Sequence, residues 1–352
     1  MKTSQWSGSS LVRVGLVGVC VTWMVACDMI PGMGTPGPEI VKDAQETLSS
    51  GDLPGAAAQY SKLAGENPGS IEVAVGQAYM QVLQGDLDGA DATLAATEEV
   101  AGERLSEVKM RRAIIARQQK DFEAMKEHGL ASGMPAGRLL AAELHLINLE
   151  SDEAAAILRE LTGEQGRVGD TASEYLNMLD SGDQILTGLA EATALWSLGD
   201  RGPASSSAEE LVKGLPEDDD SKPARILLWS GRAATSGEAA VAASLLDELS
   251  FPPQGQAWRV QATRAIIAAA QGEVDESIRI LNALEAGGAP QDGLADARAT
   301  ACALVDDKKK AKEIVGDLES PAVARCLARA GASQLAPARS PDGPLKTFLE
   351  NQ

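Results

Sequence analysis

The sequence predicts an all-α protein built from a repeated helical hairpin, and three observations predict this fold. Alanine supplies much of the 44% hydrophobic content, and alanine favours helix while letting helices pack closely. A small residue followed four and seven positions later by apolar residues recurs along the chain, most often at intervals of 34 residues. Glycine followed by an acidic residue precedes several of these trios and indicates a turn between two helices.

The trios divide the chain into eight copies of one unit. In the first copy they are Ala56, Tyr60 and Leu63, which share one face of a helix and place the small residue where two helices touch. The third copy is degenerate, because His128 and Ala131 stand at its apolar positions. The first members of the eight trios are Ala56, Ala90, Ala124, Ala154, Ala208, Ala242, Ser277 and Ala311.

Residues 1–26 predict a secretory signal peptide. Lys2 and Arg13 precede an uncharged, mainly aliphatic stretch at residues 14–26. This stretch is too short to span a membrane, which takes about 20 mainly apolar residues. The segment that ends at Cys27, Met-Val-Ala-Cys, resembles the lipobox of bacterial lipoproteins. The resemblance implies that Cys27 is acylated and begins the mature chain; the alternative is an ordinary buried cysteine at the end of a signal anchor.

Residues 27–38 are expected to comprise the lipidated cysteine and a tether. Three prolines and three glycines fall within residues 30–38, a composition that excludes both helix and sheet. Such a tether lets a folded domain stand away from the membrane.

The unit at residues 51–68 resembles the second half of the tetratricopeptide repeat (TPR). The resemblance extends over residues 39–318, although the first-helix positions of the family are poorly kept. It implies a right-handed α-solenoid of about eight TPR-like hairpins, with first helices lining a concave groove where partners bind. The matching positions are Gly51, Asp52, Ala56, Tyr60, Leu63 and Pro68.

The solenoid is expected to have two arms. The long step of 54 residues between Ala154 and Ala208 predicts an irregular helical insert at residues 166–182, between an N-terminal arm at 39–165 and a C-terminal arm at 183–334. Ser320 and Pro321 are helix start signals, so a C-terminal capping helix is expected from there to about Gln334. Such a helix covers the exposed end of a repeat array. Residues 335–352 are expected to form a tail.

The charge of the chain excludes several classes of partner. Removal of residues 1–26 takes away two basic residues and no acid, so the net charge of −20 becomes −22. A chain with this charge is repelled by nucleic acid and by anionic membrane surfaces, which leaves the lipid anchor as its only predicted membrane contact. With three Phe and three Tyr, it also has few platforms on which bases or sugars could stack.

Two cysteines remain in the mature chain besides Cys27. In an oxidising compartment Cys302 and Cys326 are candidates for a disulfide. If their helices run parallel, the two lie about 7 Å apart along the axis, which is near the upper limit for a bridge. Two small buried hydrophobic residues are therefore the preferred interpretation, with the disulfide as the alternative.

The sequence predicts no catalysis, metal or cofactor. The mature chain contains two histidines, His128 and His145, and lacks H-E-x-x-H and paired-cysteine ligand spacing. The G-x-S-x-G and P-loop motifs are also absent. We therefore expect a non-enzymatic protein.

One segment reverses the acidic character of the chain. Residues 108–120 hold five basic residues and no acid, and Lys109, Arg112 and Arg117 are candidates for docking an acidic segment or a C-terminal carboxylate. The preferred interpretation is a solvated face that pairs with neighbouring acids, such as Glu98, Glu99 and Asp121. Two aromatic residues, Tyr79 and Trp196, fall at similar first-helix positions and are either groove anchors or ordinary core.

Together these features predict a lipid-anchored scaffold or assembly factor of the bacterial cell envelope, facing the periplasm and binding another envelope protein. The choice between inner and outer membrane stays open. Lipoproteins of similar design help to assemble outer-membrane barrels, pilus secretins and cell-wall synthases, a likeness of architecture that does not fix function. The alternative is an accessory subunit of a polysaccharide- or cell-wall-handling system that binds a glycan or an enzyme.

Overall fold

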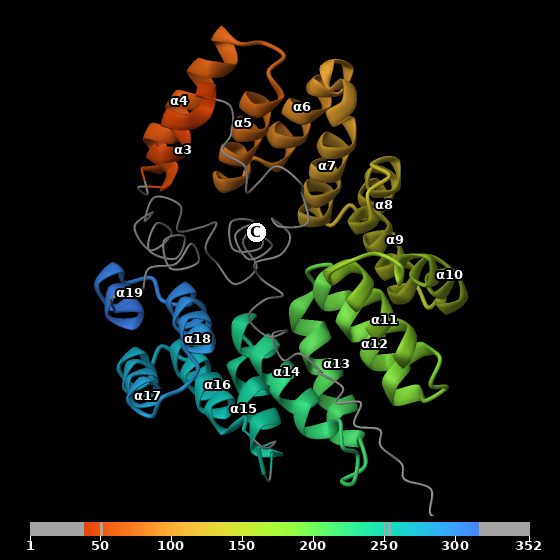
Figure 1. The fold of residues 1–352 in the computed structure, drawn as a ribbon, viewed down its shortest axis with the longest axis vertical. Helices are drawn as coiled ribbons and strands as arrows, with labels where there is room; N and C mark the ends of the chain where they lie inside the picture. The colour runs from red at the N-terminus through yellow and green to blue at the C-terminus, as the bar shows by residue number, and fades with distance from the viewer. Residues whose placement is uncertain (1–38, 50–51, 250, 253–254, 317–352) are drawn as a thin grey trace, which may run out of the picture.

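The computed structural model describes residues 39–49, 52–249, 251–252 and 255–316, and within these ranges the chain is all-α (Figure 1). Seventeen α-helices and three short 3-10 helices account for the regular structure of the described residues, which include no strand. The predicted all-α fold is confirmed. The helices are η1 (Glu39–Val41), α3 (Lys42–Ser49), α4 (Leu53–Glu66), α5 (Ile71–Leu83), α6 (Leu87–Thr97), η2 (Glu98–Val100), η3 (Gly102–Arg104), α7 (Leu105–Gln119), α8 (Phe122–Ala131), α9 (Pro135–Ile147), α10 (Ser151–Leu161), α11 (Arg167–Leu179), α12 (Gln184–Ser197), α13 (Arg201–Gly214), α14 (Lys222–Thr235), α15 (Ala239–Asp247), α16 (Ala257–Ala270), α17 (Val274–Ala286), α18 (Gln291–Ala303) and α19 (Lys308–Val315).

Sixteen of these helices pack in sequence as eight hairpins, as the repeat predicts. The pairs are α3/α4, α5/α6, α7/α8, α9/α10, α12/α13, α14/α15, α16/α17 and α18/α19. The predicted capping helix at residues 320–334 lies outside the described residues, as do the signal peptide, the tether and the tail.

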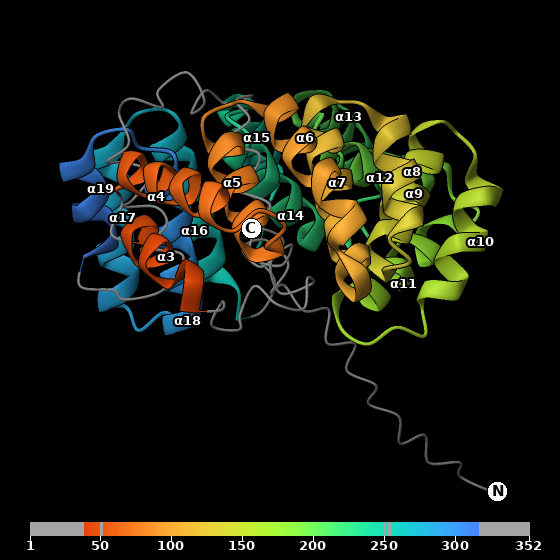
Figure 2. The same cartoon turned by 90° about the horizontal axis from the view of Figure 1, so that it is seen from above.

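The hairpins follow one another around a ring. Some consecutive first helices pack together: α9 against α12, α14 against α16 and α16 against α18. Second helices such as α10 and α17 lie on the outer rim (Figure 1). The first and last described helices, α3 and α19, lie on the same side of the ring in the face view and in the view from above (Figure 2). The array is therefore a curved solenoid.

The turn inside each hairpin explains the recurring glycine and acid. Gly85 takes a left-handed conformation, with φ of 82°, that ends the first helix of its hairpin. The next residue, Asp86, caps the second helix, and its Oδ1 accepts a hydrogen bond of 2.9 Å from the backbone N–H of Gly89. Three hairpins break this pattern: the turn of α18/α19 has no glycine and no positive φ, and the turns of α7/α8 and α9/α10 use another residue. Lys120 and Leu149, with φ of 60° and 62°, are the two non-glycine residues with positive φ in the described part of the chain.

The repeated trios form the core between the helices. Ala154, Leu158 and Leu161 are all fully buried, and the first members of the other regular trios are buried too. The degenerate third copy buries a different pair, Met125 and Gly129, one position further along α8.

A close contact between α8 and α9 explains this shift. A Cβ atom added to Gly137 would lie 2.2 Å from the backbone oxygen of Gly129, so only two glycines allow the backbones to approach this closely. The apolar residues of a regular trio are therefore replaced here by a glycine contact.

The long interval between trios, where an irregular helical insert was expected at residues 166–182, contains one regular helix, α11. Its residues Val168, Ala172 and Tyr175 repeat the spacing of four and three, so α11 has a buried face like the other helices. It packs between α10 and α12 without a hairpin partner. Because α12 still packs on α9, the row of first helices continues past the extra helix.

No helix among the described residues is both long enough and apolar enough to cross a membrane.

Candidate functional site

The basic face of α7 is paired within the protein. Lys109 Nζ lies 3.1 Å from Glu98 Oε2, and Arg112 donates to both carboxylate oxygens of Asp91 at 2.7 and 2.9 Å. Arg112 also donates to Glu98 Oε1 at 2.7 Å. Although burial opposes the effect, these hydrogen bonds lower the pKa of Glu98. This is the arrangement expected of a charged face paired with neighbouring acids, with Asp91 in place of the expected Glu99 and Asp121.

Arg117 was expected on a partner-binding surface, and the structure corrects this. Its side chain is buried, with 8% of the residue exposed, because the C-terminal end of α7 turns towards α9 and α12. Its Nη1 lies within 3.5 Å of the backbone oxygen of Ser197. Burial lowers the pKa of Arg117 to about 10, partly offset by the charge of Glu143.

Arg117 belongs to a buried polar network centred on Glu143 of α9. The hydroxyl of Tyr175 on α11 donates to Glu143 Oε1 at 3.0 Å, and the hydroxyl of Ser197 on α12 donates to Oε2 at 2.9 Å. Glu143 is 3% exposed, and burial raises its pKa to about 7 despite these two hydrogen bonds. Three helices are thus joined by one carboxyl group.

Two tryptophans and two further arginines extend the network. The guanidinium of Arg232 on α14 lies 5.1 Å from the ring centre of Trp196 and 4.7 Å from that of Trp229. The guanidinium of Arg201 on α13 lies 4.8 Å from the Trp196 ring. A cation over an indole face is electrostatically favourable, more so in a dry environment. Arg232 also donates to the hydroxyl of Thr193 at 3.2 Å.

The positions of these arginines in their helices help to explain why they tolerate burial. Arg117 and Arg232 each lie in the last turn of their helix. The C-terminal end of a helix carries a partial negative charge, which favours a cation there. Glu143 adds a carboxyl group in the same region. The buried guanidinium groups are therefore balanced by helix ends, by a titratable carboxyl and by aromatic faces.

The network also joins hairpins that are not neighbours in the array. The contact of Arg117 with Ser197 connects the third hairpin to the fifth and bypasses the fourth. A second link runs parallel to it, because Lys120 Nζ lies 2.5 Å from Asp200 Oδ1. The C-terminal ends of α7 and α12 therefore lie close together.

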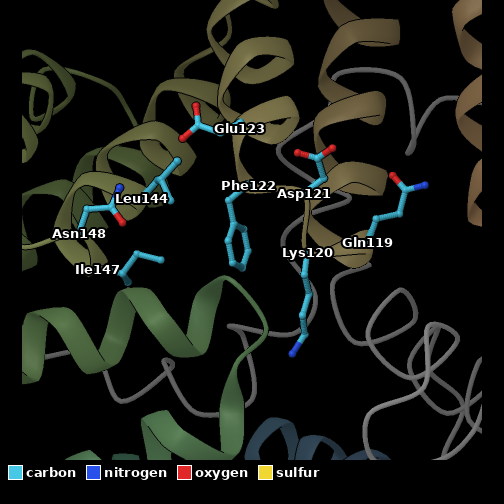
Figure 3. Close-up of a pocket in the computed structure, with 8 residues that line it drawn as sticks. All are labelled: Gln119, Lys120, Asp121, Phe122, Glu123, Leu144, Ile147 and Asn148. Carbon is cyan, nitrogen blue, oxygen red and sulfur yellow. The ribbon is translucent and has the colours of Figure 1, made fainter.

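A hollow of about 570 Å3 opens beside this junction. Phe122, Leu144 and Ile147 provide its apolar surface, and Lys120, Glu123 and Asn148 contribute polar groups (Figure 3). In the close-up the ring of Phe122 points between the apolar side chains of α9 and the aliphatic chain of Lys120. The hollow therefore combines three apolar side chains with polar and charged ones.

The two aromatic candidates lie in different surroundings. Trp196 is buried, with 5% exposed, and its indole N–H donates to Ser236 Oγ at 3.2 Å, so it belongs to the core. Tyr79 is half-buried on α5 against the N-terminal core.

Cys302 lies fully buried on α18 and is disulfide-bonded, which differs from the preferred interpretation of two buried thiols. Cys326 lies outside the described residues, so the pairing of these two cysteines stays a prediction. Cys27 also lies outside them.

Within the described ranges, no group of three or more His, Cys, Asp or Glu side chains is placed to hold a metal ion. His145, one of the two histidines, lies 2.6 Å from Glu150 Oε2 through its Nδ1.

Sequence reasoning missed the buried network because its members come from helices far apart in the chain. One local signal was present: Glu143 interrupts the otherwise apolar run Leu-Leu-Ala-Ala-Glu-Leu of α9. A carboxyl at such a position needs internal partners. A second signal was the absence of glycine at Lys120 and Leu149, where four other hairpin turns of the repeat place one.

The sequence matches no protein-family model and no curated protein. Solved structures similar to this chain include two TPR proteins. One is a tetratricopeptide repeat protein from Parabacteroides merdae, with 13% identity over 75% of this chain and 97% of that chain and a TM-score of 0.34. The other is the TPR domain of P58(IPK), with 16% identity over 85% and 97% and a TM-score of 0.22. The TPR-like character of the array is argued from its own repeat length, hairpin turns and small-residue contacts.

Proposed function

We propose that this protein is a lipid-anchored scaffold or assembly factor of the bacterial cell envelope, which binds another envelope protein. The observation that carries the proposal is the single curved array of eight hairpins, held together around a buried network. Arrays of this kind present extended surfaces of fixed shape to protein partners. The lipobox-like segment at Cys27 supports the anchor and the location.

The glycan-binding alternative is less well supported. Sugar binding uses exposed aromatic faces, whereas Trp196, Trp229 and Tyr175 are buried and Tyr79, Phe122 and Trp258 are half-buried. Phe251 is 83% exposed, but it is a lone aromatic in a loop. A protein partner therefore remains the better proposal.

Affinity purification from gently solubilised envelopes, followed by mass spectrometry, tests this function. We expect a reproducible envelope protein in near-stoichiometric amount. An eluate that stays empty after mild crosslinking would contradict the scaffold function and direct attention to a small ligand.

Cys27→Ser tests the anchor. Because Cys27 is the only predicted acylation site, the variant should lose its acyl chains and appear in the soluble fraction when membranes are sedimented. Cys20→Ser is the matched control, since it makes the same substitution within the segment removed on processing and leaves Cys27 in place. Retention of the Cys27→Ser protein in the membrane fraction would refute lipid anchoring.

A further inference from the structure

We propose that the hollow beside the α7–α8 turn is a docking site for a basic peptide segment of a partner protein, anchored by one large apolar side chain. The proposal rests on the scaffold function and specifies which surface serves it. The site lies at the turns of the third and fourth hairpins, where the C-terminal ends of α7 and α9 meet the start of α8.

The first argument is the shape and lining of the hollow. Its volume of about 570 Å3 exceeds what a single side chain needs, and three of its eight lining residues, Phe122, Leu144 and Ile147, are apolar. Phe122 and Ile147 are both half-buried, so a guest side chain can cover the exposed parts of both. Burial of an apolar anchor in such a recess is the usual centre of a protein interface.

The second argument is the backbone at the edge of the hollow. In four other hairpins the residue that ends the first helix is glycine, in a left-handed conformation, for example Gly85 and Gly237. The two hairpins that border the hollow keep Lys120 and Leu149 there instead. Side chains held in this conformation are strained, and such strain gathers at binding sites.

Both residues lie at the hollow, where a bound peptide would contact them. Lys120 lines the hollow, and Leu149 directly follows the lining residue Asn148. Leu149 is 73% exposed, which is unusual for a leucine. Glycine would relieve the strain at either position, so the retained side chains indicate a use for them.

The third argument is charge, which selects the kind of guest. Asp121 and Glu123 line the hollow, and both are exposed. Lys120 is the one cation that lines it among the described residues. Lys120 is paired with Asp200, Glu123 is paired with Lys126, and Asp121 caps α8. With these partners included, the edge carries one carboxylate more than it has ammonium groups, on a chain with a net charge of −20. Lysine or arginine residues beside the apolar anchor complement this edge.

A random dodecapeptide library, panned on the full chain, tests the proposal. Enriched peptides should carry a large apolar residue flanked by Lys or Arg. Their affinity, measured by fluorescence polarisation, should fall at least tenfold for Phe122→Ala and for Glu123→Lys. Glu127→Lys is the matched control, because it makes the same charge change one turn further along α8 on an exposed residue outside the lining. Circular dichroism shows whether each variant is folded, and the exposed Glu123→Lys keeps the test valid if Phe122→Ala unfolds.

Three outcomes would overturn the proposal. Enriched peptides that bind wild type and folded pocket variants equally would place binding elsewhere, which leaves the scaffold function standing. Enrichment of acidic peptides would overturn the proposed basic guest and would leave the scaffold function standing. Failure to enrich any peptide, combined with an empty eluate in the envelope purification, would sink the docking site and the scaffold function together.

Discussion

Replacing Glu143 by glutamine should remove a pH dependence from the stability of the protein. Burial raises the pKa of this carboxyl from 4.5 to about 7 in the folded state. The folded protein therefore binds a proton that the unfolded chain releases between these two values. A raised acid pKa contributes stability that is full below pH 4.5 and is lost as the pH rises through about 7.

The magnitude follows from the size of the shift. One pKa unit corresponds to about 1.4 kcal/mol, so wild type should lose about 2–3 kcal/mol between pH 5 and pH 8 through this group. Glutamine imitates the protonated carboxyl. Its carbonyl oxygen can accept from the Tyr175 hydroxyl, and its amide can donate to Ser197 Oγ. The variant should match wild type at pH 5 and exceed its stability by about 2–3 kcal/mol at pH 8.

Urea denaturation at pH 5, 6, 7 and 8 provides the measurement. The difference between variant and wild type isolates Glu143, because other titrating groups are common to both proteins. Glu127→Gln, a change at an exposed carboxyl on α8, should leave the pH profile unchanged. If the Glu143→Gln variant is less stable than wild type at pH 8, the carboxylate is ionised and held by Arg117 and Arg232, and the reasoning is refuted.

Three other substitutions test separate parts of the structure. Leu149→Gly should raise the free energy of unfolding by about 1 kcal/mol, because it relieves a left-handed leucine; an unchanged thermal midpoint would argue against strain. Gly137→Ala should cost about 2 kcal/mol or more, since its Cβ would meet the backbone of Gly129, while Gly163→Ala, with nothing within 4 Å, should be nearly neutral. Arg112→Ala should cost about 1–2 kcal/mol in urea denaturation, because it breaks half-buried charged hydrogen bonds; a loss below 0.3 kcal/mol, taken as about the error of the measurement, would show that these pairs are unimportant.

The hairpins were predictable from sequence because their determinants are local. The glycine and acid of a turn lie within one hairpin, and the trio lies within one helix, so spacing alone reveals them. The degenerate third copy shows the limit of this approach. There the contact between Gly129 and Gly137 replaces side-chain packing, and its geometry depends on two backbones at close approach.

The candidate site was largely unpredictable because it is assembled over long distances in the chain. From the sequence, Arg117 was interpreted as part of a basic surface. A sequence shows the charge of a residue but not which face of its helix is buried. Its contact Ser197 lies 80 residues away. Lys109 and Arg112 lie on a face paired with acids, the interpretation that the sequence favoured, and their role in partner binding stays a prediction. One of their partners, Asp91, belongs to the preceding hairpin.

The links between the third and fifth hairpins have a consequence for how the molecule unfolds. In an ordinary repeat array each unit touches only its neighbours, so stability is a sum of local terms and unfolding can begin at any interface. Here Arg117 and Lys120 contact residues 80 positions away, and the segment from α7 to α14 shares one apolar core. We therefore expect this segment to open as a single cooperative unit, with amide hydrogens that exchange more slowly than those of α3 to α6 and α16 to α19. Under mechanical load we expect α3 to α6 and α16 to α19 to deform first, while the segment from α7 to α14 stays rigid.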